Sequence, residues 1–247
     1  MVILDLVFNQ LLVLKIMDSF CEIIAVILGF YCFSIMLKQY HVKKSKTTIY
    51  LMIIFFTLAC APLSQFIDGL FYSGWSIHNT FGLYDVQYGY AFILISTTLA
   101  NIGLLLFSVD VFLTKQEGPY PKNTKIVVIG GSILIGTLGI LGGILKLNDR
   151  EVTAIIGIYF VIAMIMYILL GTKAYKLSNK ISEAIYKKSI KYIGHFAFSL
   201  LAIYIFFILD SFSTTYTIWG FFGWAVYLLA TYLAYIGFVK PIKVRMK

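Results

Sequence analysis

The sequence contains seven separate stretches of mostly apolar residues, and each is long enough to cross a lipid bilayer as an α-helix. Crossing the hydrocarbon core requires about 20 such residues. The stretches cover residues 19–37, 48–71, 88–113, 126–145, 152–170, 192–211 and 218–239. Each is continuously apolar rather than alternating, which excludes a β-barrel. We therefore predict an all-α polytopic membrane protein, folded as a seven-transmembrane-helix bundle.

The composition supports this prediction. Of the 247 residues, 60% are hydrophobic and 13% are charged, whereas soluble domains have about 45–50% and about 25%. Most connections are short, so we expect one membrane domain over residues 1–247 and no appended soluble module. Residues 1–16 are apolar but include Asp5 and Lys15 and lack signal-peptide features. We expect them to form a short interfacial N-terminal segment that leads into the first span.

The distribution of basic residues predicts the orientation. With seven spans, 17 of the 20 Lys and Arg residues fall on one side of the membrane, and Lys15, Lys146 and Arg150 fall on the other. The basic side is expected to be cytoplasmic, which places the N-terminus outside and the C-terminus inside a plasma (cell) membrane. The same residues are expected to meet anionic lipids at the cytoplasmic face. Nucleic-acid binding is therefore not needed to explain the net charge of +9.

Polar and aromatic residues gather at the predicted outer ends of the spans. Ionisable groups inside a span are the first place to look for function. We interpret the group as an acidic, aromatic vestibule that binds a cation, an amine or a proton. The alternative is that these are interfacial residues in contact with headgroups and water. The candidate ligand-binding residues are Glu22, Gln65, Asp68, Tyr88, Tyr90, Asp210 and Trp224.

Two ionisable residues lie near the predicted cytoplasmic ends of spans, Asp110 in the third and His195 in the sixth. Both are candidates for a cytoplasmic switch. Asp110 is expected to pair with a cytoplasmic lysine, either as a latch that opens during signalling or as a simple anchor for the helix. His195 has no second histidine at its depth, which argues against a haem or metal site.

Small residues recur at helical spacing along the fourth span, at Ser132, Gly136, Gly139 and Gly143. Such a face allows another helix to approach closely, either from the same chain or from a second copy. In the second span, Pro62 has no N–H group. It is expected to free a backbone carbonyl and to kink the helix beside polar residues.

The longest connection between spans, residues 173–191, has a helical pattern with an apolar stripe and six lysines. It predicts helical extensions of the fifth and sixth spans. This segment is interpreted either as a docking surface for a partner or as a basic helix that lies on the inner leaflet.

Several classes of function are excluded. Retinal needs a lysine in the middle of the bundle, and the lysine of the seventh span, Lys240, follows its apolar run. No hydrolase, metalloprotease or nucleotide-binding motif is present, so we expect neither an enzyme nor a cofactor. Cys21, Cys32 and Cys60 lie inside apolar stretches without paired spacing, which predicts neither a disulfide nor a metal site.

The segment Tyr235–Pro241 and the sixth span, with its lysine-rich start, Gly194 and the final Asp210–Ser211, resemble a known family. They are similar to the seven-helix membrane sensor regions of prokaryotic histidine kinases and their stand-alone archaeal relatives. The resemblance implies sensing, with no catalytic residues to carry over. Because no kinase follows in this sequence, we expect the signal to pass to a separate protein.

The first hypothesis is therefore a receptor-like membrane sensor that binds a small ligand or cation outside and signals through cytoplasmic helix ends. Its partner would be a cytoplasmic signalling protein. The second is a small-molecule or ion permease, which requires polar residues through the middle of the bundle. The third is a structural subunit of a larger membrane complex, with another membrane subunit as its partner. The mid-bundle polar residues are Thr97, Thr98, Asn101 and Thr231.

Overall fold

The computed structural model describes residues 2–72, 88–113, 122–147, 153–211 and 218–241. Within these ranges every element is a helix, and seven helices are long and apolar enough to cross a membrane. This confirms the predicted all-α bundle with seven candidate spans. The elements are α1 (Val2–Lys43), α2 (Lys46–Tyr72), α4 (Tyr88–Ser108), η1 (Val109–Leu113), α5 (Lys122–Leu147), α6 (Thr153–Ser178), α7 (Ala184–Ser211), α8 (Ile218–Ala234) and η2 (Tyr235–Val239).

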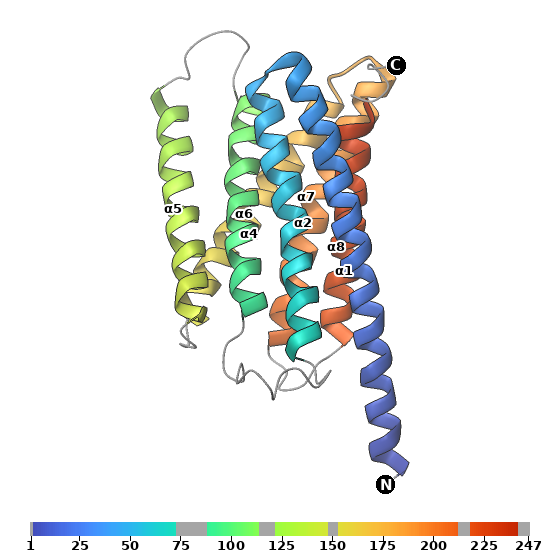
Figure 1. Cartoon of the computed structure of the whole chain (residues 1–247). Helices are drawn as coiled ribbons and strands as arrows, with labels where there is room; N and C mark the ends of the chain where they lie inside the picture. The colour runs from blue at the N-terminus through green and yellow to red at the C-terminus, as the bar shows by residue number, and fades with distance from the viewer. Residues whose placement is uncertain (1, 73–87, 114–121, 148–152, 212–217, 242–247) are drawn as a thin grey trace.

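The helices form a ring in which each contacts its neighbours in the chain, and α8 closes the ring against α1 (Figure 1). Successive helices run in opposite directions, so α1 and α8 are parallel. We call the end of the ring nearer the chain's N-terminus the N-terminal end, and the opposite end the C-terminal end. The α5 helix lies at the edge of the ring, mainly against α4.

The first helix is longer than its span requires. It runs without a break from Val2 to Lys43, about 63 Å at the usual rise per residue, and it extends beyond the other helices at the N-terminal end (Figure 1). Residues 2–16 are thus the first turns of α1 and lead without a break into the first span; their interfacial position stays a prediction. The apolar span of α1 begins at Ile16, three residues before the predicted start at 19. It therefore includes Asp18, which the sequence analysis left outside.

The connection between the fifth and sixth spans is helical at both ends and broken in the middle. α6 continues to Ser178 and α7 begins at Ala184. The predicted helical extensions are therefore present, and the helical pattern of 173–191 is interrupted at residues 179–183. The Ser178 hydroxyl donates a 2.8 Å hydrogen bond to the Tyr175 carbonyl. Such local side-chain bonds compete with helix continuation, and the chain turns here.

The small residues of α5 face α4 of the same chain. A Cβ atom at Gly139 would lie 1.7 Å from the Thr98 hydroxyl oxygen, and one at Gly143 would lie 3.1 Å from a backbone carbonyl of α4. The two helices therefore approach more closely than any side chain at these positions would permit. On the same predicted face, a Cβ at Gly136 would lie 3.5 Å from an α4 side chain, and the Ser132 hydroxyl is buried without a hydrogen-bond partner among the described residues.

Candidate functional site

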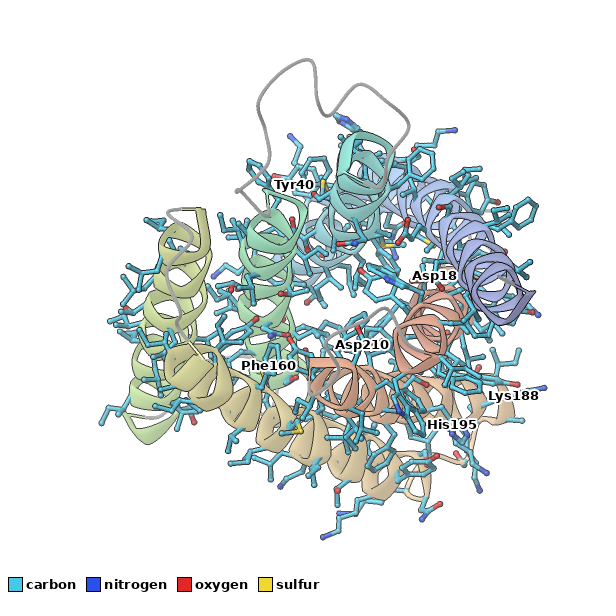
Figure 2. All side chains as sticks on the ribbon, turned by 90° about the horizontal axis from the view of Figure 1, so that it is seen from below. Asp18, Tyr40, Phe160, Lys188, His195 and Asp210 are labelled. Atoms are coloured by element: carbon cyan, nitrogen blue, oxygen red, sulfur yellow. The ribbon has the colours of Figure 1, made fainter. Side chains whose placement is uncertain are left out.

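Three carboxylates gather at the N-terminal end of the bundle, and we call them the acidic cluster: Asp18 and Glu22 of α1 and Asp210 of α7. Asp18 interacts electrostatically with both of the others. Figure 2 views the ring from this end and shows Asp18 and Asp210 toward its middle. Asp18 and Glu22 are buried, with 5% and 4% of their surface exposed. Two elements far apart in the chain therefore bring three carboxyl groups together.

Asp210 lies against the first turn of α8. A Cβ atom at Gly220 would lie 3.3 Å from either carboxylate oxygen of Asp210, and α8 begins two residues earlier at Ile218. The N-terminus of a helix carries partial positive charge that stabilises an anion. Glycine at position 220 allows the carboxylate to come this close, so the charge of Asp210 has a structural explanation.

The other two carboxylates have no such explanation. The Asp18 Oδ1 atom is fully buried and has no hydrogen-bond partner among the described residues. The backbone amides around it are committed to the hydrogen bonds of α1. The part of the chain that the structure describes provides no ion pair to Asp18 or Glu22. A buried charge without a partner is costly, so these two residues are the strongest candidates for a ligand site.

Neighbouring helices place an aromatic and an amide side chain at the same depth. The rings of Tyr31 on α1 and Tyr235 have centroids 6.0 Å apart. The two helices run in parallel, so counting back eleven residues on each leads to two positions at equal depth. These are position 20 on α1 and Trp224 on α8, which places Trp224 between Asp18 and Glu22 in depth. Trp224 is buried and its ring stands 5.5 Å from that of Phe207.

Counting residues from a contact between α1 and α2 places Gln65 at the same depth as Asp18 and Glu22. A Cβ atom at Gly29 of α1 would lie 2.9 Å from the Cβ of Ala59. Because α1 and α2 run in opposite directions, six residues toward the N-terminal end lead to position 23 and to Gln65. Four predicted ligand-binding residues, Glu22, Gln65, Asp210 and Trp224, are thus at the same end of the ring. The side chains of Asp68, Tyr88 and Tyr90 lie outside the described residues.

Sequence reasoning missed Asp18 because the first span was predicted to start one residue later. A signal was present in the spacing. Asp18 precedes Glu22 by four residues, which places both carboxylates on one face of a helix. Extending the helical pattern by a single turn would have included it.

A second polar group lies deeper in the bundle, and we call it the tyrosine hub: Asn101 of α4, Tyr159 and Tyr167 of α6 and Tyr204 of α7. The Asn101 amide donates hydrogen bonds of 2.8 Å to Tyr159 and 3.3 Å to Tyr204. The Tyr167 hydroxyl donates a 2.5 Å bond to the Asn101 carbonyl oxygen. All four side chains are buried. One asparagine thus joins three helices, and no sequence motif marked the three tyrosines.

The other mid-bundle hydroxyls are occupied locally. Thr97 and Thr98 donate to carbonyls of their own helix, at 2.8 and 2.6 Å. Thr231 donates a 3.0 Å bond to the Tyr227 carbonyl. Side chains that bond their own helix in this way do not offer a continuous polar path for a solute.

The proline of α2 has its carbonyl satisfied from across the ring. Pro62 has no N–H to donate to the Leu58 carbonyl four residues earlier. The Tyr227 hydroxyl of α8 donates a 2.8 Å hydrogen bond to that carbonyl. The Tyr227 ring also stands 5.4 Å from the Trp224 ring. The freed carbonyl that the sequence predicted is therefore present, and it links α2 to the helix that carries Trp224.

Towards the C-terminal end, four aromatic rings close the interior, and we call them the phenylalanine cluster: Phe55, Phe107, Phe196 and Phe238. The Phe238 ring meets the other three edge-on, at 6.2, 5.1 and 5.8 Å. All four are buried. Phe238 lies in η2, a π-helical turn, and Phe107 lies two residues before Val109, the first residue of the π-helical turn η1. Such turns often occur at functional sites.

The two predicted switch residues are separated in the structure. The Thr47 hydroxyl of α2 donates a 2.6 Å hydrogen bond to Asp110 in η1. The expected lysine partner of this carboxylate stays a prediction. His195 is exposed on the outside of the ring (Figure 2). Its Nδ1 atom lies 2.8 Å from the Tyr175 hydroxyl. The structure therefore does not bring Asp110 and His195 together.

Among the described residues, no group of three or more His, Cys, Asp or Glu side chains is arranged to hold a metal ion. Cys21, Cys32 and Cys60 are free thiols. Comparisons with protein families, with curated proteins and with solved structures found no match.

The fold therefore defines the class. The chain is a multi-pass helical membrane protein with seven candidate spans. Within that class, it is a closed helical ring with a buried acidic cluster at one end and a phenylalanine cluster towards the other.

Proposed function

We propose that this protein is a receptor-like sensor of the plasma membrane that binds a small ligand at the acidic cluster. The lysine distribution supports an orientation with the N-terminus and the acidic cluster outside and the C-terminus in the cytoplasm. The observation that carries the proposal is that Asp18 and Glu22 are buried at the N-terminal end of the ring without a countercharge among the described residues. Towards the C-terminal end, the phenylalanine cluster fills the interior of the ring.

The interior supplies a route by which ligand binding would reach the cytoplasmic end. Trp224 packs against Phe207 of α7. Tyr204, one turn away on the same helix, belongs to the tyrosine hub. Phe196, two turns further along α7, contacts Phe238 of η2. A shift of α7 on ligand binding would therefore move the packing of both π-helical turns. The resemblance to sensor regions supports the same direction of signalling, with a separate cytoplasmic protein as the receiver.

The interior favours this function over a permease. The mid-bundle hydroxyls bond their own helices, and the tyrosine hub is hydrogen-bonded within itself. The phenylalanine cluster then fills the space towards the C-terminal end. A solute pathway would have to break these contacts in each transport cycle. The sensor requires only that they shift.

The test is whether the two ends are coupled energetically. Asp18→Asn removes the charge that a cationic ligand would neutralise and thereby imitates the bound state. In lipid nanodiscs we expect this variant to change amide hydrogen exchange in Tyr235–Val239 by about fivefold, the size of a coupling of about 1 kcal/mol. Asn101→Leu, combined with Asp18→Asn, should abolish that response. The control Glu183→Gln, an exposed residue at the C-terminal end, should leave it unchanged.

Equal exchange in Asp18→Asn and the parent protein would overturn the sensor proposal. Uptake of a ligand into proteoliposomes at the rate of a carrier would instead support a permease. These two outcomes are independent, because the first reports on conformation and the second on flux.

A further inference from the structure

The acidic pair of α1 is an unusual arrangement for a membrane span. Asp18 and Glu22 are four residues apart, so their side chains lie one above the other on the same helix face. Like charges at this spacing destabilise a helix, and ionisable residues inside a span are expensive. Both residues are nevertheless buried, and each lies in the electrostatic field of the other. This arrangement calls for a positive partner.

One atom shows where that partner would bind. The Asp18 Oδ1 is fully buried and has no hydrogen-bond partner among the described residues. Asp210, the third member of the acidic cluster, lies against the N-terminus of α8. Among the described residues, therefore, Asp18 and Glu22 are the members of the acidic cluster without a countercharge.

The chemistry of the surroundings selects an organic ammonium over a metal ion. In the described part of the chain no three His, Cys, Asp or Glu side chains are arranged to hold a metal ion, and the acidic cluster is no exception. An ammonium group carries up to three N–H donors and one positive charge, and one or two carboxylate oxygens suffice to hold it. Trp224 lies at the same depth on α8, beside Phe207. Aromatic faces attract cations within about 6 Å and also accommodate an apolar substituent.

We propose that Asp18 and Glu22 bind the ammonium group of a small organic amine, with its apolar part towards Trp224 between α1 and α8. The inference rests on the proposed function and specifies its ligand class. Asp18 is the principal anchor, because its unpaired oxygen is available to accept a hydrogen bond from the ammonium. Glu22 supplies the second carboxylate one turn further into the membrane.

The experiment compares two probes of the same shape. Phenethylammonium and 2-phenylethanol differ in the charged group and share the aromatic tail. Thermal unfolding of the purified protein in nanodiscs is followed at constant pH and ionic strength. At about ten times its dissociation constant, phenethylammonium should raise Tm by about 3–6 °C. The alcohol, and sodium chloride at the same concentration, should give no comparable shift.

Variants assign the effect to residues. Asp18→Asn and Glu22→Gln keep the shape of each side chain and remove its charge, and each should weaken binding of phenethylammonium about tenfold or more. Trp224→Leu should weaken it less, because it removes only the aromatic contact. Glu183→Gln is the matched carboxylate control at the far end and should bind like the parent. Lys15→Gln, close to Asp18 in the sequence, should not reduce binding.

Equal stabilisation by the alcohol or by sodium chloride would overturn the inference. So would undiminished phenethylammonium binding in Asp18→Asn and Glu22→Gln. If one of these variants does not fold, the other variant and the comparison of the two probes on the parent protein still test whether the protein binds an ammonium group. Failure of the sensor proposal can be told apart from failure of this inference. In that case phenethylammonium would bind the parent protein and bind the variants less tightly, but amide exchange at Tyr235–Val239 would not change.

Discussion

The hydroxyl of Tyr227 donates a 2.8 Å hydrogen bond to the carbonyl of Leu58, the group that Pro62 leaves without its helical donor. Because no water competes for this carbonyl in the interior of a membrane protein, its partner must come from the protein. The bond joins residues 169 positions apart, and it fixes α8 against the proline turn of α2.

This bond predicts that Tyr227→Phe is destabilising. The variant keeps the ring contacts and leaves the carbonyl unsatisfied, at an expected cost of about 1–2 kcal/mol. Unfolding in mixed micelles measures the change, and Tyr232→Phe, an exposed tyrosine of the same helix, should have almost no effect. In a Pro62→Ala background, where the backbone N–H returns, the cost should shrink. An undiminished cost there would contradict the proposed role of Tyr227.

The tyrosine hub predicts unequal costs for two similar substitutions. Tyr167→Phe removes the donor of the 2.5 Å bond to the Asn101 carbonyl oxygen, and we expect a loss of about 1–2 kcal/mol. Tyr159→Phe should cost less, because the Asn101 amide retains Tyr204 as an acceptor at 3.3 Å. Thermal unfolding of both variants at one lipid composition measures the difference. Equal costs would mean that Asn101 does not organise the hub.

The contact of α5 with α4 predicts that alanine substitutions at two glycine positions of α5 have different effects on stability. Gly139→Ala places a methyl group where the Thr98 hydroxyl lies, and overpacking of this kind costs about 1–3 kcal/mol. Gly130→Ala is the matched control, since no atom lies within 4 Å of a Cβ built there. Unfolding midpoints of the two variants provide the comparison. Thr98→Ala should partly rescue Gly139→Ala by removing the nearest oxygen.

The link between α2 and η1 predicts a local effect at the C-terminal end. Thr47→Val removes the 2.6 Å hydrogen bond to Asp110 and should speed amide exchange in Val109–Leu113 about tenfold, which corresponds to the loss of about 1.5 kcal/mol. Thr47→Ser retains the hydroxyl and should exchange like the parent. If both variants exchange alike, the bond does not stabilise this turn.

The proposed orientation predicts one-sided chemical labelling. In a background without Cys21, Cys32 and Cys60, the variant Glu183→Cys places a thiol in the exposed turn between α6 and α7. It should react with a membrane-impermeant maleimide only after the cells are opened, because positive-side loops face the cytoplasm. Labelling in intact cells would reverse the orientation.

Span prediction succeeded where apolar length alone decides. The predicted bounds 126–145 and 218–239 coincide with the spans Ile126–Leu145 and Ile218–Val239. It was less accurate where polar residues lie inside a helix. Asp18 was left outside the first span, although a continuous α1 carries it into the ring. Composition is averaged over a window and gives little weight to one buried carboxylate, whereas packing against neighbouring helices determines whether that carboxylate is covered.

Apolar length and the uneven lysines determined, from the sequence by itself, a seven-helix membrane bundle and its expected orientation, because these follow from the bilayer as a solvent and need no knowledge of neighbours. Only the tertiary structure decided which polar groups meet. It paired Tyr227 with Leu58, gathered Asn101 with tyrosines from two other helices, and left Asp18 without a described partner. These contacts depend on the rotation and depth of each helix in the ring, which hydrophobicity does not encode.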